Sequence, residues 1–581
     1  MSFREIVTLQ VGHYSNFVGT HMWNAQESSF NYDPAKASEK EICHDVLYRE
    51  GQNLQREVTF TPRLVLLDLK GSLRTLRQQG DLYDMGIEEE VNWPGDVTMH
   101  SEDRPARNAF LKSLHKEDSR IDDDDNHDED DDCISKDNGK TSKKKKKMAH
   151  CKESDTDRMQ QDKTHSFDEQ VKVWSDFLGA RFHPKTIQVV QEFRHQEEYS
   201  PFDIYPLGEE VMRNYETTCE WEDRVHYFTE ECDNLQGFHL LADTHNGFGG
   251  IMSGMLKYLE DEFPGKGVLA FGLTPADASD DTAQARATRI INSALAYDTA
   301  CRHSSLFVPA SVAKGLWRLL EPPRKYPYLD FNSSPFHTSA ILAAAIDTMT
   351  LPYRLYDGAI NITDITHSFN AQGRKMASLS ANFPLGLYQD ESLVDFLTPY
   401  VAEMNVYPWQ PLTPHITNQN APFIQSAVSR GAMFNGAQTK TDSQKLPQCF
   451  TNVKSTEETI RNFLFEKSRG SPFSLQCLKT SISTKMPFPQ IFSKAISKTG
   501  YVSTSDRPDG VSVETAPVIT SLQCAPDLCD LIGQLTSSAS KMNIKKHHRY
   551  LSAGLEEDDF TDVLDNLNAV ANCYHMYREA M

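Results

Sequence analysis

The chain has 581 residues, of which 39% are hydrophobic and 10% aromatic, and its formal charge is −23. This length exceeds one ordinary core, so we expect two to four globular domains. Much of the charge is local, because nine of the eleven residues from Asp122 to Asp132 are acidic and Lys143 to Lys147 are five consecutive lysines. The remainder is only mildly acidic, so a general affinity for nucleic acid is not expected.

Eleven cysteines are scattered along the chain without a CxxC pair, which favours reduced thiols in the cytosol. The start, MSFREIVTLQ, has no apolar signal segment, and its Glu5 is untypical of an import peptide. No window approaches the roughly 18 uninterrupted apolar residues of a membrane helix. The longest run of small apolar residues, AILAAAI at Ala340–Ile346, is expected to be a buried helix. Any membrane association is therefore expected to be peripheral.

Five nearly continuous apolar runs predict strands that are buried on both faces. Helical stretches precede the third run and the fifth run, at residues 208–233 and 282–300. This alternation predicts an α/β fold with a mostly parallel, Rossmann-like sheet flanked by helices. Ligands of such sheets bind at the C-terminal ends of the strands, where VGHYSN and HNGFGG fall. The five runs are Ile6–Val11, Arg63–Leu69, Gly237–Ala242, Val268–Leu273 and Ser305–Ala310.

The block at residues 112–163 is rich in Asp, Lys, Ser and Asn and has almost no apolar residues. Such a composition cannot offset the entropy of ordering, so we predict a disordered insertion within a first domain, residues 1–350. We interpret its five lysines as solvated charge balance for the acidic run. A nuclear-import or phosphate-binding patch is the alternative.

The patterns weaken after Pro352. Arg374–Tyr388 predicts a strand within an intermediate α/β domain, residues 351–520, whereas residues 435–481 are rich in Thr, Ser and Gln and are expected to be mostly loop. Two helical segments are predicted within residues 521–581. The second segment has an apolar face at helical spacing, which predicts that it docks on the rest of the protein. That face consists of Phe560, Val563, Leu564 and Leu567.

The segment HNGFGGIMSG, at residues 245–254, lies between an apolar strand and a helical stretch. This order is typical of a phosphate-binding turn, in which backbone N–H groups and a helix N-terminus hold an anion. However, His245, Phe248 and Ile251 place side chains where such a turn needs bare backbone.

Two further interpretations of this region are weaker. A hydrolase would place its serine at the centre of a G-x-S-x-G turn, but Gly250, Ser253 and Gly254 have the spacing G-x-x-S-G. Zinc ligation by Cys232, His239 and His245 is disfavoured, because their spacings of seven and six residues place no pair on one helix face.

Four segments, in chain order, resemble the tubulin/FtsZ superfamily. FREIVTLQVGHYSNFVGTHMWN is similar to its first strand, loop and helix, and TPRLVLLDLKGSL to its second strand and loop. CDNLQGFHLL is similar to the strand before its glycine-rich loop, and NAQGRKMASLSANFPL to the start of its intermediate domain. With the charged insertion and the divergent last third, these segments resemble the Misato family of tubulin-like proteins. The resemblance implies a tubulin/FtsZ-like fold with an intermediate domain and C-terminal helices, and a role in mitochondrial distribution and morphology.

The resemblance places Gly12, Asn16, Gly247 and Gly249 at vestigial positions of the nucleotide loops. It implies that Tyr14 adds bulk where a phosphate would lie. We expect the two later glycines to persist because the chain must still bend there, and a side chain at a left-handed position costs about 1–2 kcal/mol.

The polar groups of a GTPase are also missing from the matching positions. Where tubulins read ribose and base with Glu and Asn, this chain has Ala283, Tyr297 and Ala340. Where tubulin-like GTPases complete a neighbour's site with a carboxylate, this chain has Gln372, which cannot polarise water as a carboxylate does. We therefore predict a degenerate GTPase fold with no catalytic residue, no cofactor and no metal.

Two hypotheses of function follow. The first is a non-enzymatic cytoplasmic protein, peripherally associated with the mitochondrial outer membrane, that regulates mitochondrial distribution, morphology and fusion through protein partners. Chaperonin or tubulin-handling machinery is an expected partner, because such folds need folding help. KKHHR, at Lys545–Arg549, is a candidate contact for anionic lipid, although a charged helix end is the simpler interpretation. The second hypothesis is a GTP-binding, self-assembling tubulin-like GTPase with a cytoskeletal or chromosome-segregation role.

Overall fold

The structure, a computed structural model, describes most of the chain. None of the helices in the part it describes is both long and apolar enough to cross a bilayer. Apart from its first three residues, the expected insertion at 112–163 lies outside the described residues. These are residues 4–30, 40–52, 56, 58–78, 107–114, 167–276, 282–317, 323–403, 406–417, 420–433 and 446–575.

The five apolar runs form neighbouring parallel strands of one sheet, as predicted. The order of this sheet is β5-β4-β1-β6-β7-β8. Strands β1, β6, β7 and β8 are buried along their whole length, which is why they read as unbroken apolar runs. Strand β5 was not predicted, because it lies at the sheet edge and its second half mixes polar and apolar residues. The strands are β1 (Ile6–Val11), β4 (Leu64–Lys70), β5 (Ile187–Arg194), β6 (Gly237–Asp243), β7 (Gly267–Leu273) and β8 (Leu306–Ala310).

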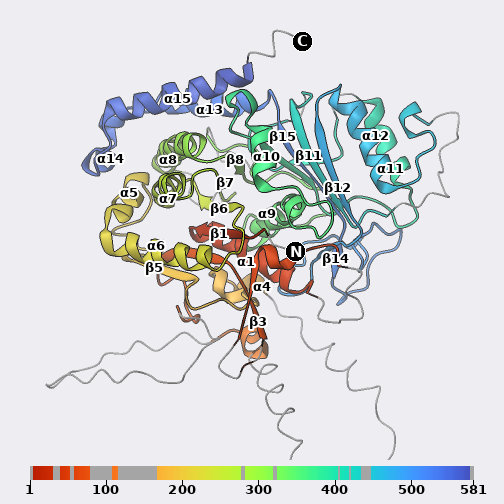
Figure 1. Ribbon diagram of the computed structural model, residues 1–581, viewed down its shortest axis with the longest axis horizontal. Coiled ribbons are helices and arrows are strands. Elements are labelled where there is room, and N and C mark those ends of the chain that lie inside the picture. Colours follow the sequence, from red (N-terminus) through yellow and green to blue (C-terminus); the bar gives the residue numbers. More distant parts are fainter. Residues whose placement is uncertain are drawn as a thin grey trace, which may run out of the picture.

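Helices cover both faces of this sheet. Figure 1 shows α5 to α8 on one side and α1 and α9 on the other. Helix α9 contains the AILAAAI run and is buried as predicted, because it packs against α1 and also touches strands of a second sheet. The elements are α1 (His13–Glu27), α4 (Phe167–Gln170), α5 (Tyr205–Arg213), α6 (Tyr215–Glu230), α7 (Phe248–Glu262), α8 (Ala283–His303), α9 (Pro335–Met349) and the hairpin of β2 (Tyr48–Gln52) and β3 (Val58–Pro62).

The second sheet is mixed and has the order β10-β9-β15-β11-β12. In Figure 1, α9 lies between the two sheets, and α11 and α12 lie on the far side of the second sheet. The strand predicted within Arg374–Tyr388 is confirmed as β9. The elements of this region are α10 (Ile362–Phe369), β9 (Ser378–Asn382), α11 (Leu393–Ala402), β10 (Gln410–Pro411), β11 (Ile424–Arg430), α12 (Thr456–Ser468), β12 (Phe473–Leu478), β13 (Ile482–Ser483), β14 (Thr515–Ala516) and β15 (Val518–Cys524).

Two expectations about this region are wrong. The described residues of this stretch, 446–481, are not mostly loop, because they contain α12 and the edge strand β12. The exposed face of α12 carries mostly charged residues, whereas Ile460, Phe463 and Leu464 on its other face are buried. The expected domain boundary at residue 520 also fails, because it falls inside β15, which pairs with both β9 and β11.

The predicted C-terminal helices are confirmed as α13 (Leu528–Ala539), α14 (His548–Ser552) and α15 (Glu557–His575). Helix α15 packs on α13 and α8, and its apolar face at Phe560, Val563 and Leu567 is buried. Near its end, the Tyr574 hydroxyl accepts the N–H of Met376 and donates to the carbonyl of the same residue, both at 2.9 Å. Helix α15 therefore packs on α8 next to the parallel sheet and also bonds to the segment that leads into β9 of the mixed sheet.

Candidate functional site

The two predicted loops meet at one edge of the parallel sheet. Strands β1 and β6 are neighbours, and Val11 lies opposite Ala242. Each strand is followed within a few residues by a helix, α1 or α7, so two helix N-termini face the same region. Such N-termini attract anions, because their first N–H groups have no partner within the helix.

At the start of α1, the N–H groups that could bind a ligand anion are bonded instead to a carboxylate of the protein itself. Asp243, the last residue of β6, is fully buried. Its side chain accepts the N–H groups of Tyr14 at 3.1 Å and Ser15 at 2.8 Å, and the hydroxyl of Ser15 at 2.6 Å. Burial raises the pKa of Asp243 to about 6, although these hydrogen bonds lower it. Asp243 was not singled out from the sequence, although an aspartate that ends a buried apolar strand was the available signal.

Gly12 is required by this arrangement. It lies at φ +116°, a conformation that side chains rarely adopt. A Cβ at this position would also stand 2.5 Å from Cγ of Asp243. The Tyr14 side chain is buried and donates from its hydroxyl to Oγ1 of Thr338 on α9 at 3.1 Å. Gly12 thus makes room for the carboxylate.

Asn16 attaches α1 to the neighbouring strand β4. Its side-chain amide donates to the Leu67 carbonyl at 3.2 Å and to Oδ2 of Asp68 at 3.1 Å. The same Asp68 oxygen accepts Nε1–H of Trp174 at 2.8 Å and lies 3.1 Å from Nδ1 of His13. Burial raises the pKa of Asp68, but His13 and the hydrogen bonds hold it below its ordinary value.

The glycines at the start of α7 serve helix packing, and this corrects the expectation that they persist for a bend. Gly247 is the N-cap and has φ −61° and ψ −25°, which any residue adopts. A Cβ on Gly208 of α5 would stand 1.8 Å from the Gly247 carbonyl oxygen, and one on Gly250 would stand 2.1 Å from the Tyr205 carbonyl oxygen. The backbones of α5 and α7 touch, so side chains are excluded there. Gly249 is in looser surroundings, where a Cβ would meet side chains at 3.2 Å or more.

The first N–H groups of α7 have partners within the chain. Gly247 donates to the Phe202 carbonyl at 3.3 Å, Phe248 to Oδ1 of Asn246 at 3.0 Å, and Gly249 to the Asn246 carbonyl at 3.2 Å. The Phe248 ring is buried edge-on against Phe202, with ring centroids 5.1 Å apart. This N-terminus is therefore closed by packing and local hydrogen bonds.

A second residue that sequence reasoning missed is Asn292, in the middle of α8. Its amide donates to the carbonyls of Asp203 at 2.6 Å and His245 at 2.8 Å. Its oxygen accepts the N–H of Tyr205 at 2.9 Å and the hydroxyl of Tyr550 at 2.7 Å. The signal in the sequence was an asparagine among apolar residues of a predicted helix, and the structure shows that its side chain is fully buried. Asn292 ties the glycine-rich loop to α5 and to α14.

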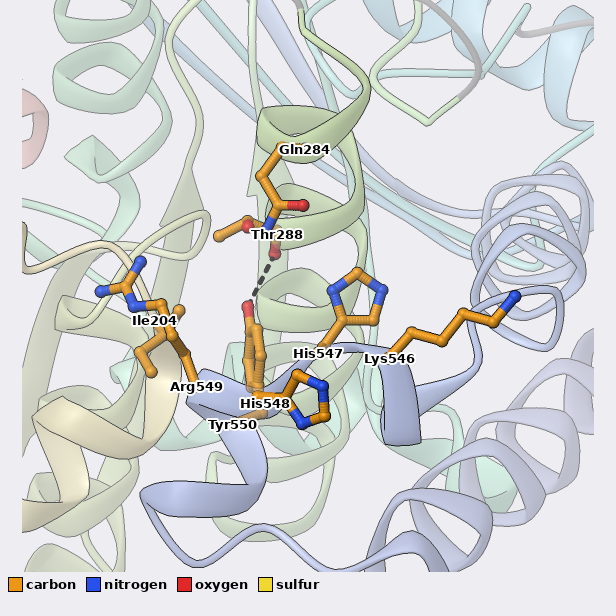
Figure 2. A pocket seen from close by; sticks show the side chains of 8 residues that line it. All are labelled: Ile204, Gln284, Thr288, Lys546, His547, His548, Arg549 and Tyr550. Atoms are coloured by element: carbon orange, nitrogen blue, oxygen red, sulfur yellow. Dashed lines mark hydrogen bonds between the residues drawn. The ribbon is translucent and has the colours of Figure 1, made fainter.

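A pocket of about 220 Å³ lies beside this junction (Figure 2). The Tyr550 hydroxyl oxygen also lies there 3.2 Å from the Thr288 carbonyl oxygen, the longer of its two contacts. Arg549 forms a bidentate ion pair with Asp203 at 2.7 and 2.6 Å, and Lys545 pairs with Glu557 at 2.7 Å. These pairs favour the charged-helix-end interpretation of KKHHR over a lipid contact. The lining residues are Ile204, Gln284, Thr288, Lys546, His547, His548, Arg549 and Tyr550.

The positions matched to ribose and base readers do not form one site. Ala283 and Tyr297 are fourteen residues apart on α8, which corresponds to about 21 Å along a helix. Tyr297 packs against Phe307 and Trp317 in the core, and Ala340 is buried within α9. Gln372 lies in an exposed turn at φ 63°, where its side-chain oxygen accepts a bond from Arg374 at 2.7 Å.

The other candidate residues are separated from one another. Cys232 donates to the Phe228 carbonyl, His239 lies 2.6 Å from the Tyr353 hydroxyl, and Ser253 is buried within α7 instead of at a turn. Across the part of the chain that the structure describes, no group of three or more His, Cys, Asp or Glu side chains is placed to hold a metal ion.

The parallel sheet, the two loops at its edge and the mixed sheet beyond α9 define a tubulin-like α/β protein. Comparison with known proteins agrees: residues 163–355 match the Tubulin domain, and residues 4–116 match the Misato Segment II tubulin-like domain.

Full-length relatives identify the family within that class. Protein misato homolog 1 of Danio rerio is 32% identical over 582 residues, which cover 98% of this chain and 97% of the relative. The Homo sapiens protein of the same name is 32% identical over 578 residues, and Protein misato of Drosophila melanogaster is 27% identical over 588 residues, each with 98% of both chains covered. The chain belongs to the Misato family.

Proposed function

We propose that this chain is a non-enzymatic, tubulin-like protein that regulates mitochondrial distribution, morphology and fusion through protein partners. It acts in the cytoplasm, peripherally associated with the outer surface of mitochondria. Membership of the Misato family supports the mitochondrial part of this proposal. The geometry of the two loops supports the non-enzymatic part.

The non-enzymatic part rests on the position of the buried Asp243 carboxylate, which accepts the first N–H groups of α1. A phosphate brought to the N–H groups of Tyr14 and Ser15 meets a carboxylate already bonded there at 3.1 and 2.8 Å. Moving that carboxylate aside would leave it buried without its donors, at a cost of roughly 1–3 kcal/mol for each unpaired group. The fold thus supplies its own anion where a nucleotide would bring one.

The start of α7 adds a second obstacle. Its first three N–H groups are bonded to Phe202 and Asn246, so a phosphate would have to displace them. Phe248 and Ile251 are buried side chains in the same turn. A nucleotide would therefore break internal bonds at both helix N-termini before gaining its own.

The topology supports the proposal of chaperonin or tubulin-handling machinery as partners. In each sheet, central strands pair with strands far away in the sequence: β1 (Ile6–Val11) with β6 (Gly237–Asp243), and β9 (Ser378–Asn382) with β15 (Val518–Cys524). Such pairings form slowly and leave strand edges exposed during folding. Assistance during folding is the expected consequence.

Depletion and rescue in cells test the mitochondrial role. Loss of the protein is expected to alter the mitochondrial network seen by fluorescence microscopy. Wild-type protein and Gln372→Ala are expected to restore the network equally, because Gln372 has no catalytic part in this account. An unchanged network after depletion would remove the mitochondrial proposal. If a folded Gln372→Ala protein fails to restore the network, the proposal that the protein is non-enzymatic is contradicted.

The alternative, a self-assembling GTPase, makes an opposite prediction in a sedimentation assay. Pelleting of purified protein that requires GTP and is abolished by Gly247→Trp would support it. We expect the same small pellet with GTP, with GDP and without nucleotide.

A further inference from the structure

Seven serine or threonine residues of the chain are followed by proline. Kinases that recognise this dipeptide bind the substrate as an extended peptide, so the hydroxyl and the residues on both sides must be accessible. The structure describes all seven positions, and it presents them differently. They are Thr61, Ser200, Thr274, Ser334, Thr398, Thr413 and Ser471.

Five of these hydroxyls are inaccessible or held in a helix. Thr61, Thr274 and Thr413 are buried, with at most 1% of their surface exposed. Ser334 is the N-cap of α9, and its hydroxyl oxygen accepts the N–H of His337 at 3.3 Å. Thr398 lies within α11 and donates to the Val394 carbonyl at 2.7 Å. None of these segments can extend without local unfolding.

Ser471 is half-buried in the short connection between α12 and β12. The carbonyl of the following Pro472 accepts the N–H of Gln425 at 3.2 Å. Strand β12 then begins at Phe473 and pairs with β11. The residues after this serine are therefore part of the sheet and cannot enter a kinase groove.

Ser200 differs in its own exposure and in that of the residue before it. Ser200 is exposed and Tyr199 is 96% exposed, whereas Phe202, two residues after Ser200, is buried. Strand β5 ends at Arg194 and α5 begins at Tyr205, and the residues between them form neither helix nor strand. Segments of this kind are where modifying enzymes and proteases gain access to folded proteins.

A guanidinium group lies close to this serine. Nη2 of Arg549 donates to the carbonyl of Pro201, the next residue, at 3.2 Å. The same side chain holds Asp203 by its bidentate ion pair. Consecutive Cα atoms are about 3.8 Å apart, so Ser200 lies one residue from the carbonyl that Arg549 binds.

We propose that Ser200 is phosphorylated by a proline-directed serine/threonine kinase and that Arg549 binds the phosphate. Oγ of Ser200 forms a bond to the γ-phosphorus of ATP, ADP leaves, and the kinase takes the hydroxyl proton. This proposal goes beyond the proposed function and does not depend on it.

The phosphate would strengthen the attachment of α14 to the rest of the protein. It adds a charge of about −1.5 to −2 beside a guanidinium group, where charge-assisted hydrogen bonds form. Tyr550, the next residue along α14, bonds to Asn292, which holds the His245 carbonyl. Modification at Ser200 thus acts at the junction between the glycine-rich loop and the C-terminal helices.

The first test of the proposal is site mapping on the purified full-length chain. The chain is incubated with ATP and a kinase of the mitogen-activated class, and phosphopeptides are quantified by mass spectrometry. We expect at least about tenfold more phosphate on Ser200 than on any of the other six positions, because those require local unfolding. Ser200→Ala is the control for assignment. Labelling spread evenly over the seven positions, or absent from Ser200, would overturn the proposal.

The second test concerns Arg549. Phosphorylation is expected to slow amide hydrogen exchange in residues 546–552 about threefold in the wild type. The slowing should be absent in Arg549→Ala and retained in Arg461→Ala, a remote exposed arginine on α12 that also forms an ion pair. The same slowing in Arg549→Ala would show that another group receives the phosphate.

Discussion

The N-termini of α1 and α7 lie at the same edge of the sheet, yet they are closed in different ways. The start of α1 is closed by charge, because the buried carboxylate of Asp243 accepts its N–H groups. The start of α7 is closed by shape, because Gly208 and Gly250 bring α5 into backbone contact with it. The first closure depends on protonation, whereas the second depends on the absence of Cβ atoms. A glycine-rich loop is therefore not by itself a sign of ligand binding.

Disrupting the backbone contact between α5 and α7 is expected to have the largest effect on stability. In Gly208→Ala, the new Cβ would stand 1.8 Å from the Gly247 carbonyl oxygen and 2.7 Å from the Ile251 nitrogen. Both are backbone atoms of α7 and cannot rotate away, so the helices must separate. We expect the free energy of unfolding in urea to fall by about 3 kcal/mol or more.

Gly533→Ala is the matched control for that variant. Gly533 is also inside a helix, α13, but a Cβ there would meet nothing within 4 Å. Higher helix propensity should stabilise this variant by about 0.5–1 kcal/mol. Equal effects of the two substitutions would contradict the packing role of Gly208.

Removing the charge at α1 is expected to have the second-largest effect. Asp243→Ala leaves the N–H groups of Tyr14 and Ser15 and the Ser15 hydroxyl without their acceptor. We expect a loss of about 2–3 kcal/mol in urea denaturation. Asp261→Ala, at an exposed aspartate on α7, should change stability by less than about 0.5 kcal/mol. If sulfate partly restores the stability of Asp243→Ala, the vacated position is an anion-binding site. If Asp243→Ala loses no more stability than Asp261→Ala, Asp243 does not cap α1.

Protonation distinguishes the two closures further. The folded pKa of Asp243 is about 6, above its ordinary value of 3.8, so the native state binds the proton more tightly than the unfolded state. Wild-type stability should therefore fall as pH rises through this window. Asp243→Asn keeps an acceptor but does not titrate. Its stability relative to wild type should increase by about 2 kcal/mol from pH 4.5 to pH 7.5. If the stability difference between Asp243→Asn and wild type does not change with pH, the pKa of Asp243 is not raised in the folded protein.

The smallest effect is expected at Gly249, although the sequence groups it with Gly247. A Cβ there would stand 3.2 Å from the Tyr205 ring and 3.3 Å from Cβ of Ala296, both side-chain atoms. Gly249→Ala should change stability by less than about 1 kcal/mol, because better helix propensity offsets the tight contact. A loss of stability as large as that of Gly208→Ala would contradict the assignment of the tight backbone contact to Gly208.

The sequence predicted the fold well where burial is complete. Strands β1, β6, β7 and β8 are buried on both faces, so their composition alone identifies them. Prediction failed where an element is half exposed. Strand β5 and helix α12 each mix polar and apolar residues, and their type is decided by neighbours that lie far away in the sequence.

The site was predicted in part. The sequence places Gly12 and Gly247 in two separate loops, and the neighbouring strands β1 and β6 bring those loops together. The reason for each glycine was not predictable, because the atoms that exclude a Cβ come from other segments: Asp243 for Gly12 and Phe202 for Gly247. Asn292 escaped for the same reason, because its four partners are assembled only by the fold.

We propose that groups of the protein itself occupy the N–H groups at the starts of α1 and α7, so that the protein holds no nucleotide. The most direct test is mass spectrometry of small molecules released by denaturing full-length protein that was purified without added nucleotide. We expect guanine nucleotide at less than about one-tenth of the molar amount of protein, because binding must break bonds at both helix N-termini. One mole of GTP or GDP per mole of protein would contradict the account.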